Sequence, residues 1–578
     1  MSLTNSLRSF LTTTRLAVSN TVRSYSSQSI ISHKWDVTII GAGHNGLVAA
    51  AYLARSGKKV LVLERRHLVG GAAVTEEIIP GFKFSRASYV LSLLRPRIIK
   101  ELELVKFGLK VYQRNTHSFT PMRDGRYLIL SSDVDETRRE ISKFSLRDAD
   151  RYSTFEDKLC KYADAIQPYL ERAPADFSRG ISLKSLYELG PSLEAGRKLG
   201  LREIPEFTEF LISPASKWLR KWFESEPLLA TLATDAVIGA MISPNSLGSS
   251  YVLLHHVMGE YEGRKNVWVY PEGGMGSVSR AIANSAVHHG ARIEVDKTVT
   301  RILVHEGRAI GVELENGEEI RSEIVMSNAT PYVTFSKLLE RDLPKHLQNE
   351  VNLIDYTSPV TKINVAVKCL PNFTCLPNSH PDKPQSIHSA SIHLNCESMT
   401  DIHKAYLEGQ NKQVSTYPMI EMCIPSSLDP TLAPKGAHVI SLFTQYTPYN
   451  PIDGPWTESK KEDYCNCVFN SIEDYAPGFK QSVVGKDILT PPDLEAVFGL
   501  TGGNIFHGAL SLDQLYWCRP SRTLCGPVTP IANLFQCGSG IHPSGGVMGS
   551  PGLIAAETVI ELFRNKDKNT SSSSSSIN

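Results

Sequence analysis

The feature that most constrains this chain is a glycine-rich turn between a short apolar strand and an alanine-rich helix. The segment DVTIIGAGHNGLVAAAYLARSG contains Gly41, Gly43 and Gly46 in the spacing Gly-x-Gly-x-x-Gly. The β-branched run at 37–40 predicts a buried parallel strand, and residues 45–56 predict a helix that stops before a glycine. Together they predict a site for the pyrophosphate of a dinucleotide, with the unpaired N–H groups of the helix facing the phosphates.

An acid and a second pair of glycines follow this unit. Residues 60–63 predict another buried strand, and Glu64 comes directly after it, where a carboxylate accepts hydrogen bonds from ribose hydroxyls. Glu64 disfavours the 2′-phosphate of NADP, although the neighbouring Arg65 weakens that argument. Gly70 and Gly71 are not needed in a simple NAD domain, whereas they let the backbone approach an extended FAD. The pattern therefore favours FAD.

These motifs resemble the FAD-binding oxidoreductases of the phytoene desaturase and carotenoid isomerase group, which are relatives of the amine oxidases. The resemblance covers nearly the whole chain outside its two ends. It implies that the dinucleotide contacts a set of residues in the two N-terminal motifs, namely Ile40, Gly41, Ala42, Gly43, His44, Asn45, Gly46, Glu64, Arg65, Gly70, Gly71 and Ala72.

Two later segments support the same resemblance. Residues 293–331 predict a strand meander that ends in a buried strand, and the family places backbone near Val299 against the adenine. The segment NLFQCGSGIHPSGGVMGSPGL resembles the C-terminal flavin motif of the family. The resemblance implies that Gly538 lies beside the phosphate and ribityl chain, and that Val547 and Met548 lie beside the flavin ring.

The flavin segments are far apart in the sequence, which predicts a discontinuous domain. The expected fold class is α/β, with a Rossmann-type FAD-binding domain of the glutathione-reductase kind and a second α+β domain that binds substrate. We expect residues 34–100, 266–334 and 526–565 in the FAD-binding domain, and residues 101–265 and 335–525 in the substrate-binding domain.

The two ends of the chain predict tails. Residues 1–25 hold Arg8, Arg15 and Arg23, many Ser and Thr residues and no acid, which is typical of a mitochondrial transit peptide and predicts a matrix location. A tail without a targeting role is the alternative. Residues 566–578 are rich in serine and predict a disordered C-terminal tail.

The cysteines and glycines exclude the chemistry of a flavin disulfide reductase. The first of the ten cysteines is Cys160, so no cysteine pair follows the first glycine motif, and no second Gly-x-Gly-x-x-Gly unit is present for NAD(P)H. We expect hydride transfer between flavin and a substrate placed against its ring. His507, in the loop GLTGGNIFHGALS, is the candidate acid or base. A hydrogen-bonded structural histidine is the alternative.

Charge and hydropathy limit the partners. A net charge of +1 gives no electrostatic case for nucleic acid, and no apolar run is long enough for a membrane span. The adjacent pairs His255–His256 and His288–His289 point apart on a helix, so no metal site is expected. Trp218 and Trp222 stand among basic residues and predict peripheral contact with the inner mitochondrial membrane, unless they form the buried face of a helix.

Three functions follow from these patterns. The leading hypothesis is a mitochondrial FAD-dependent oxidoreductase acting on an apolar, isoprenoid-like or lipid-like, or small organic substrate. An amine oxidase is the second, although the C-terminal segment lacks an obvious aromatic pair for the flavin. The third is a flavin-bound regulatory protein with little or no turnover.

Overall fold

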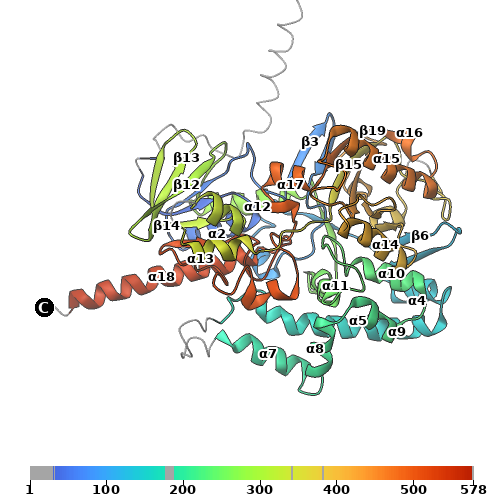
Figure 1. Cartoon of the computed structure of the whole chain (residues 1–578), viewed down its shortest axis with the longest axis horizontal. Coiled ribbons are helices and arrows are strands. Elements are labelled where there is room, and N and C mark those ends of the chain that lie inside the picture. The colour runs from blue at the N-terminus through green and yellow to red at the C-terminus, as the bar shows by residue number, and fades with distance from the viewer. Residues whose placement is uncertain (1–29, 32, 176–187, 340–342, 381–382, 576–578) are drawn as a thin grey trace, which may run out of the picture.

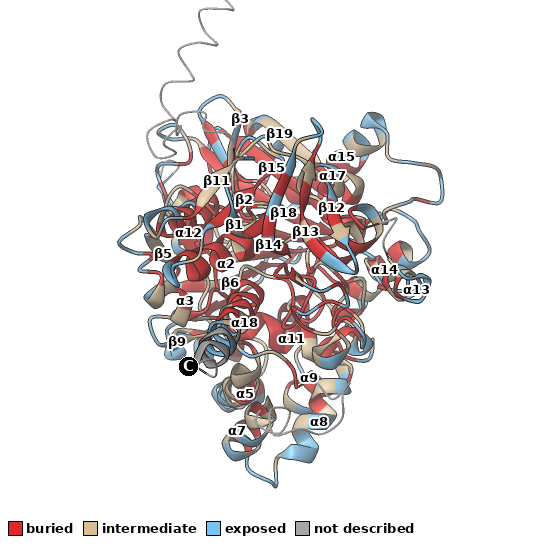
Figure 2. Ribbon diagram, turned by 90° about the vertical axis from the view of Figure 1, so that its left-hand side faces the viewer, coloured by how far each residue is buried: buried red, intermediate tan, exposed pale blue. Residues whose placement is uncertain are grey.

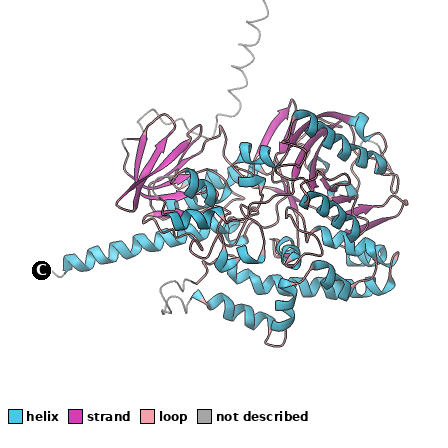
Figure 3. Ribbon diagram, in the orientation of Figure 1, coloured by secondary structure: helices cyan, strands magenta, loops and turns pink. Residues whose placement is uncertain are grey.

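The described residues form two seven-stranded sheets, one in each half of the molecule, with helices that cover and join them (Figures 1 and 3). The computed structural model describes residues 30–31, 33–175, 188–339, 343–380 and 383–575. The expected transit peptide, residues 1–25, lies outside these ranges, and so does the last part of the expected C-terminal tail, residues 576–578. The α/β fold class is confirmed.

The first sheet has a parallel core and an antiparallel extension. Its parallel strands run in the order β11, β2, β1, β14 and β20, and β14 continues into the antiparallel meander β12–β13–β14. Strands β1 and β2 at its centre are short and mostly buried, and β2 consists of Val and Leu alone, as expected for a sheet covered on both faces. Their bounds are β1 Trp35–Ile40, β2 Val60–Leu63, β11 Arg292–Glu294, β12 Val299–His305, β13 Arg308–Leu314, β14 Glu319–Ser327 and β20 Leu534–Gln536.

Helices α2 (His44–Arg55), α12 (Gly276–His288) and α18 (Ser550–Ser575) pack together on this sheet. A Cβ atom on Gly552 would lie 2.1 Å from the Asn45 carbonyl oxygen, so a glycine is needed where α18 crosses the start of α2. Residues 566–575, which the sequence predicts as part of a disordered tail, continue helix α18 and project from the body (Figure 1). Extending an existing helix costs far less than starting one.

The second sheet forms the core of the other half. Its order is β19–β15–β18–β17–β16–β6–β7, antiparallel except for the parallel pair β16–β6. Strands β15, β17 and β18 are buried at every residue, because helices and loops cover both faces (Figure 2). The bounds are β6 Thr116–Pro121, β7 Tyr127–Ser131, β15 Thr361–Val367, β16 Ser391–Leu394, β17 Met419–Cys423, β18 His438–Gln445 and β19 Val483–Leu489.

A group of helices lies against the second sheet and extends below it in Figures 1 and 2. Helices α4, α7, α9 and α11 pack around the long helix α5, which carries an apolar face, whereas α15 and α16 pack on the second sheet itself. The bounds are α4 Val134–Ser142, α5 Leu146–Ile166, α7 Gly190–Leu199, α8 Ile204–Ile212, α9 Ala215–Trp222, α10 Glu226–Thr234, α11 Ser249–Val257, α14 Met399–Gln410, α15 Glu458–Tyr475, α16 Phe479–Ser482 and α17 Pro491–Phe498.

The expected membrane surface at Trp218 is part of this helical core. Trp218 is 2% exposed and its ring lies 4.5 Å from that of Phe210 and 5.3 Å from that of Phe155. The basic residues beside it pair with glutamates, as Lys221 does with Glu209 at 2.7 Å. The buried-face alternative therefore holds for α9. Among the described residues, no helix is long and apolar enough to cross a membrane.

Two segments cross the expected domain boundary. The hairpin of β3 (Thr75–Ile79) and β4 (Phe82–Ser85) packs its phenylalanines on the second sheet. Helix α13 (Lys345–Asn352) packs instead on the first sheet. Helix α3 (Pro96–Glu101) and the ribbon of β5 (Val111–Gln113) and β10 (Val269–Pro271) pack in the core of the first half through Ile98, Val111 and Val269, and β8 (Glu260–Tyr261) pairs with β9 (Arg264–Lys265). The exact boundaries stay a prediction.

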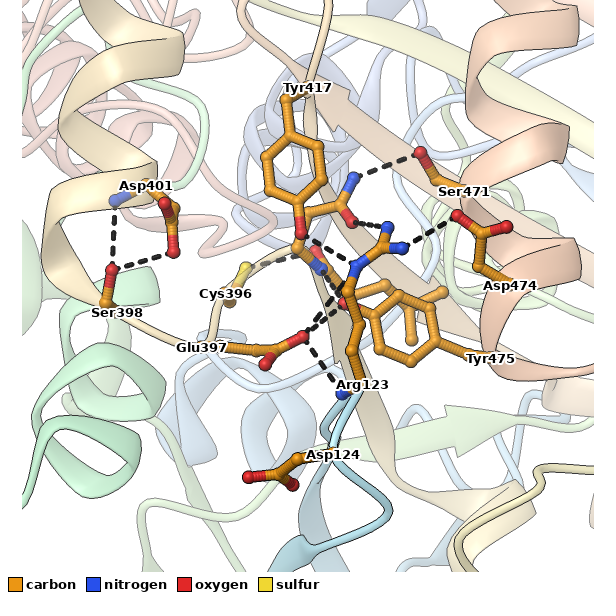
Figure 4. Close-up of polar contacts among 12 residues, drawn as sticks. Arg123, Asp124, Cys396, Glu397, Ser398, Asp401, Tyr417, Ser471, Asp474 and Tyr475 are labelled. Atoms are coloured by element: carbon orange, nitrogen blue, oxygen red, sulfur yellow. Dashed lines mark hydrogen bonds and ion pairs between the residues drawn. The ribbon is translucent and has the colours of Figure 1, made fainter.

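Arg123 fastens the far edge of the second sheet (Figure 4). Its side chain donates to Asp474 at 2.8 Å on α15, to the Tyr417 hydroxyl at 3.2 Å and to Asn395 at 3.3 Å after β16. The Tyr475 ring lies beneath the guanidinium, 5.0 Å from its carbon to the ring centre. One arginine in the β6–β7 turn thus joins three segments that are distant in sequence.

Candidate flavin and substrate site

Within the turn at 41–46, the glycine positions leave no room for a residue with a side chain or require a backbone conformation that favours glycine. A Cβ atom on Gly46 would lie 2.3 Å from the Gly41 carbonyl oxygen, and one on Gly43 would lie 2.7 Å from the side-chain nitrogen of Asn328. Gly41 has φ +91°, a conformation that favours glycine. Helix α2 starts directly after this turn with no acidic residue in its first turn. Its N–H groups are therefore available to an anion.

Glu64 closes the other side of the turn. Its carboxylate accepts a hydrogen bond from the Ala42 backbone N–H at 2.8 Å and another from the Arg66 N–H at 2.9 Å. The Gly70 N–H donates to the Ala42 carbonyl at 2.9 Å, and a Cβ on Gly71 would lie 3.2 Å from Gly43 Cα. The structure thus brings both N-terminal motifs together at the ends of β1 and β2.

The C-terminal segment completes the expected FAD site from the opposite end of the chain. We call this site, formed by the two N-terminal glycine motifs and the C-terminal segment, the flavin cradle. Asn45 donates from its side-chain amide to Ser539 Oγ at 2.9 Å. A Cβ on Gly538 would lie 2.7 Å from the Asn328 carbonyl oxygen, and the Asn328 amide donates to the Gly41 carbonyl at 3.4 Å. Asn328 follows β14 and links both glycine segments, although the sequence patterns did not single it out. The sequence feature that could have indicated Asn328 is its position directly after a predicted buried strand.

The remaining expected contacts fall into two groups. Ile40 and Val299 pack in one apolar cluster at the ends of the first sheet, and the chain before Val299 runs beside Glu64, where the Lys297 N–H donates to the Glu64 carbonyl at 2.8 Å. Arg65 is engaged elsewhere, because its guanidinium donates to the Ala496 and Val497 carbonyls of α17 at 3.2 and 3.0 Å.

The neighbouring side chains of Val547 and Met548, in the C-terminal loop, lie in different surroundings. Val547 lines a cavity together with His44 and Ala72, whereas Met548 is 1% exposed and packs in the core of the second half. The His44 ring is hydrogen-bonded to the backbone of Gly546, which joins the N-terminal and C-terminal loops a second time.

A cavity extends from these loops into the second half of the molecule. It encloses about 1560 Å³ of space free of atoms, part of it open to solvent. One end is formed by the N-terminal glycine motifs and the C-terminal segment, which we call the flavin loops. They contribute His44, Ala72, Ser539 and Val547 to the lining. The middle is apolar, and the far end is polar. The polar end includes Tyr89, Arg114, His117, Asp235, His393 and Glu421.

His507 lines the flavin end, as expected, but its ionisation differs from the expectation. Burial lowers the pKa of His507 to about 3 and that of His44 to about 4, so both rings are neutral near pH 7. His44 Nε2 and His507 Nδ1 are buried without a hydrogen-bond partner among the described residues. Burial therefore favours the neutral form of His507, and its role as acid or base stays a prediction.

Arg519 holds the His507 loop in place. It is 1% exposed and donates to the carbonyls of Phe506 at 2.5 Å and of Ala509, Gly508 and Gln514 at 3.3 Å. It also donates to the Ser539 carbonyl at 3.2 Å, which ties this loop to the flavin cradle. His507 has φ +58°, an uncommon conformation for a residue with a side chain, and these bonds help maintain it.

The adjacent histidines of α11 do not point apart, contrary to the expectation. His255 and His256 are both buried, both line the cavity, and their ring centres are 5.2 Å apart. The His256 ring stacks toward Trp268, while the His255 ring contacts Phe506 edge-on. No group of three or more possible metal ligands occurs among the described residues.

The residues of the cradle fit an FAD molecule. The glycines admit a phosphate chain that a Cβ would exclude, Glu64 stands at the ribose position, and orphaned ring nitrogens face the cavity where the flavin is expected. Helix α18 begins beside Met548 and directs its positive end toward the same loops.

Comparison with known proteins agrees with this fit. Residues 46–408 match the family model of flavin-containing amine oxidoreductases. The chain is 55% identical over 548 residues to pyridine nucleotide-disulfide oxidoreductase domain-containing protein 2 of Rattus norvegicus, covering 92% of this chain and 94% of the rat protein. It is 28% identical to prolycopene isomerase 1 of an Oncidium hybrid cultivar, over 80% of this chain and 73% of that protein.

Solved structures share the fold. Putrescine oxidase bound to putrescine matches with a TM-score of 0.57 at 15% identity, over 92% of this chain and 99% of that chain. An oxidoreductase from Methanosarcina mazei matches with a TM-score of 0.56 at 16% identity, over 91% and 99% of the two chains. The chain belongs to the flavin-containing amine oxidoreductase family, and its cofactor is FAD.

Proposed function

We propose that this protein is an FAD-dependent oxidoreductase that takes a hydride from an elongated, largely apolar substrate. The observation that carries the proposal is the cavity, which runs from Val547 and His44 in the flavin loops to Arg114 and Asp235 deep in the second half. Bound FAD would supply the acceptor for the hydride, and an external acceptor would then take the electrons from it.

The residues of the chain position the substrate and exclude water. The middle of the cavity is lined by large apolar side chains, which favour a hydrocarbon body and leave little room for ordered water. At the flavin end, neutral His44 and His507 hold hydrogen-bonding atoms without adding charge. The apolar lining of the middle consists of Leu93, Leu130, Leu232, Ile238, Phe443 and Phe506.

Related proteins support an apolar substrate. One of the subunits of limonene dehydrogenase from Castellaniella defragrans is 26% identical over 91% of this chain and 94% of that protein. Its name and that of prolycopene isomerase refer to hydrocarbon substrates. These names support the substrate class of the proposal and do not identify the substrate itself.

The reaction proceeds without a redox-active disulfide in this proposal. All ten cysteines are free thiols, and none of the residues that line the cavity is a cysteine. Burial raises the pKa of Cys537, the cysteine of the C-terminal flavin segment, so that its reactive thiolate form is disfavoured.

We further propose a location in the mitochondrial matrix. The composition of residues 1–25 supports the location. Import of the full chain into isolated mitochondria, with removal of the N-terminal segment, tests it. A chain that stays outside and uncleaved would contradict it.

An amine oxidase is the second candidate. It is favoured by the family model and by three carboxyl groups among the described residues that line the cavity, those of Glu156, Asp235 and Glu421, which could hold an ammonium group. The apolar middle of the cavity and Arg114 beside the carboxyl groups of Asp235 and Glu421 weigh against a small polar amine.

Reduction and reoxidation of the bound flavin test the proposal. We expect the purified protein to be yellow and photoreduced flavin to be reoxidised rapidly by oxygen or a quinone. Alkylation of all accessible thiols should leave both rates unchanged. A flavin that no acceptor reoxidises would favour a regulatory protein, and loss of reduction after alkylation would restore a thiol mechanism.

A further inference from the structure

Arg114 is a buried cation without a carboxylate partner. It is 5% exposed and follows β5 at the polar end of the cavity. Its Nε donates to the Trp268 carbonyl at 3.2 Å and one Nη to Ser391 Oγ at 3.1 Å, while its guanidinium carbon lies 5.3 Å from the centre of the Tyr270 ring. No carboxylate of the described residues lies within ion-pair distance of it. A guanidinium has five N–H donors, so part of this fork is unused.

The groups around Arg114 come from several elements of the second half. Those whose ionisation is coupled to its charge are His117 on β6, Asp235 after α10, Tyr270 on β10, His393 on β16, and Glu421 and Cys423 on β17. Burial lowers the pKa of both histidines to about 4, so they are neutral. Glu421 is already engaged, because it accepts the Tyr89 hydroxyl at 2.6 Å.

The two acids can adjust their charge, whereas Arg114 cannot. Burial raises the pKa of Glu421, and it raises that of Asp235 to about 7. The Asp235 carboxyl has no hydrogen bond or ion pair among the described residues and faces the cavity. A buried acid without a cation at contact distance takes up a proton, but an arginine stays charged. The fixed, uncompensated charge at this end of the cavity is therefore positive.

We infer that the polar end of the cavity binds the carboxylate of an elongated carboxylic acid, with Arg114 as its anchor and the apolar body directed toward the flavin loops. This inference rests on the proposed function and adds the head group of the substrate. Arginine and carboxylate match in geometry and form paired, charge-assisted hydrogen bonds. The cavity is continuous from Arg114 through Leu232 and Phe506 to Val547, so one molecule can span it.

The acids give the binding a defined pH dependence. An anion beside Arg114 favours the protonated forms of Asp235 and Glu421, so binding takes up protons. The affinity for a carboxylate should then fall as the pH rises through about 7, where Asp235 and Glu156, another acid of the cavity wall on α5, lose their protons. A cationic amine would show the opposite trend, because it prefers ionised Asp235. A neutral alcohol would show little dependence.

Calorimetric titration of the FAD-loaded protein with three probes of equal chain length tests this inference. The probes are decanoate, decylamine and decan-1-ol, each titrated at about pH 6 and about pH 8 in buffers of different ionisation enthalpy. We expect decanoate to bind most tightly, more tightly at the lower pH, and with uptake of protons. Tightest binding of decylamine with proton release, or equal binding of all three probes, would overturn the inference.

Variants assign the effect to Arg114. Arg114→Met should weaken decanoate binding by about tenfold or more and leave decan-1-ol within about twofold, while Arg114→Lys should restore part of the loss. Arg301→Met, at an exposed position on β12, removes the same charge from the surface and should change neither value. If Arg114→Met does not fold, the pH trend and proton uptake of the unaltered protein still decide the matter.

The flavin separates this test from that of the proposed function. A yellow protein whose flavin is reduced and reoxidised, but which ignores decanoate, would contradict the carboxylate inference alone. A protein that binds decanoate through Arg114 but whose flavin no substrate reduces would contradict the proposed function alone.

Discussion

The side-chain amide of Asn45 donates a hydrogen bond to Ser539 Oγ at 2.9 Å, across 494 positions of the chain. Asn45 is in the first turn of α2, and Ser539 is in the loop after β20, so this bond closes the flavin cradle between its N-terminal and C-terminal parts. Both side chains are buried, which makes the bond costly to break.

Removal of the Ser539 hydroxyl should loosen the FAD. Ser539→Ala leaves the Asn45 amide buried without an acceptor, at a cost of about 1–3 kcal/mol. If this loss destabilises the flavin cradle, FAD affinity falls by about tenfold. The fluorescence of flavin released on dilution measures this affinity. Ser482→Ala removes a buried hydroxyl that donates to Phe479 at 2.6 Å in the other half. Equal FAD affinity in both variants would show that the cradle does not depend on this bond.

A methyl group at position 46 should disrupt the packing of the glycine turn and prevent FAD binding. Gly46→Ala places a Cβ 2.3 Å from the Gly41 carbonyl oxygen, and the backbone of a buried helix cannot move away cheaply. We expect a loss of about 3 kcal/mol or more in unfolding free energy and little bound FAD. Gly196→Ala, on helix α7 with no atom near the added group, should be neutral or slightly stabilising. Normal FAD content in Gly46→Ala would refute the packing of the turn.

Loss of Arg519 should release the His507 loop. Arg519→Met leaves five buried carbonyl contacts without their donor, and we expect a loss of about 3–5 kcal/mol in unfolding free energy. Arg519→Lys keeps the charge but not the fork, so it should recover only part of this. Thermal melting with and without FAD measures both. Arg522→Met, at an exposed position, serves as the control. If Arg519→Met melts at the same temperature as this control, Arg519 does not hold the His507 loop in place.

Asp235 should make the protein less stable as the pH rises. Its pKa is raised to about 7 by burial, from an unfolded value of about 3.8, so the folded state holds a proton that the unfolded state has lost. Its contribution is present in full below the unfolded pKa and is lost as the pH rises to about 7. The difference is at most about 4 kcal/mol, less if water enters the cavity.

Asp235→Asn removes the contribution of Asp235 and leaves that of Glu156, whose pKa burial also raises to about 7, so the variant should melt at a higher temperature than the unaltered protein above about pH 7 and at a similar temperature near pH 4. Denaturant unfolding across this range is the measurement. Exposed Asp150→Asn is the matched control. Parallel stability curves for the Asp235→Asn variant and the unaltered protein would show that the carboxyl is not desolvated.

The flavin cradle could be predicted from the sequence because its parts are local. Gly41, Gly46 and Glu64 lie within one strand–helix–strand unit, where spacing alone fixes which backbone groups meet. The expected helix at 45–56 differs from α2 by one residue at each end. The late segment with Val547 is placed only by its resemblance to the C-terminal flavin motif of the family.

The substrate end of the cavity could not be predicted in this way. Arg114, Asp235 and Glu421 come from three separate elements and show no common spacing, so only the folded topology brings them together. Trp218 illustrates a second limit. Its helix shows an amphipathic pattern, but the pattern does not say whether protein or membrane covers the apolar face, and α5 and α8 cover it here.

The most direct test of the central claim is the absorbance of the bound flavin during anaerobic titration with a lipid-inclusive extract of mitochondria. We predict that a component of the extract bleaches the flavin, and that Ser88→Trp, which fills the cavity lined by Ser88 while the cradle stays intact, prevents the bleaching. Bleaching of the Ser88→Trp variant at the same rate would contradict the claim that substrate reaches the flavin through this cavity.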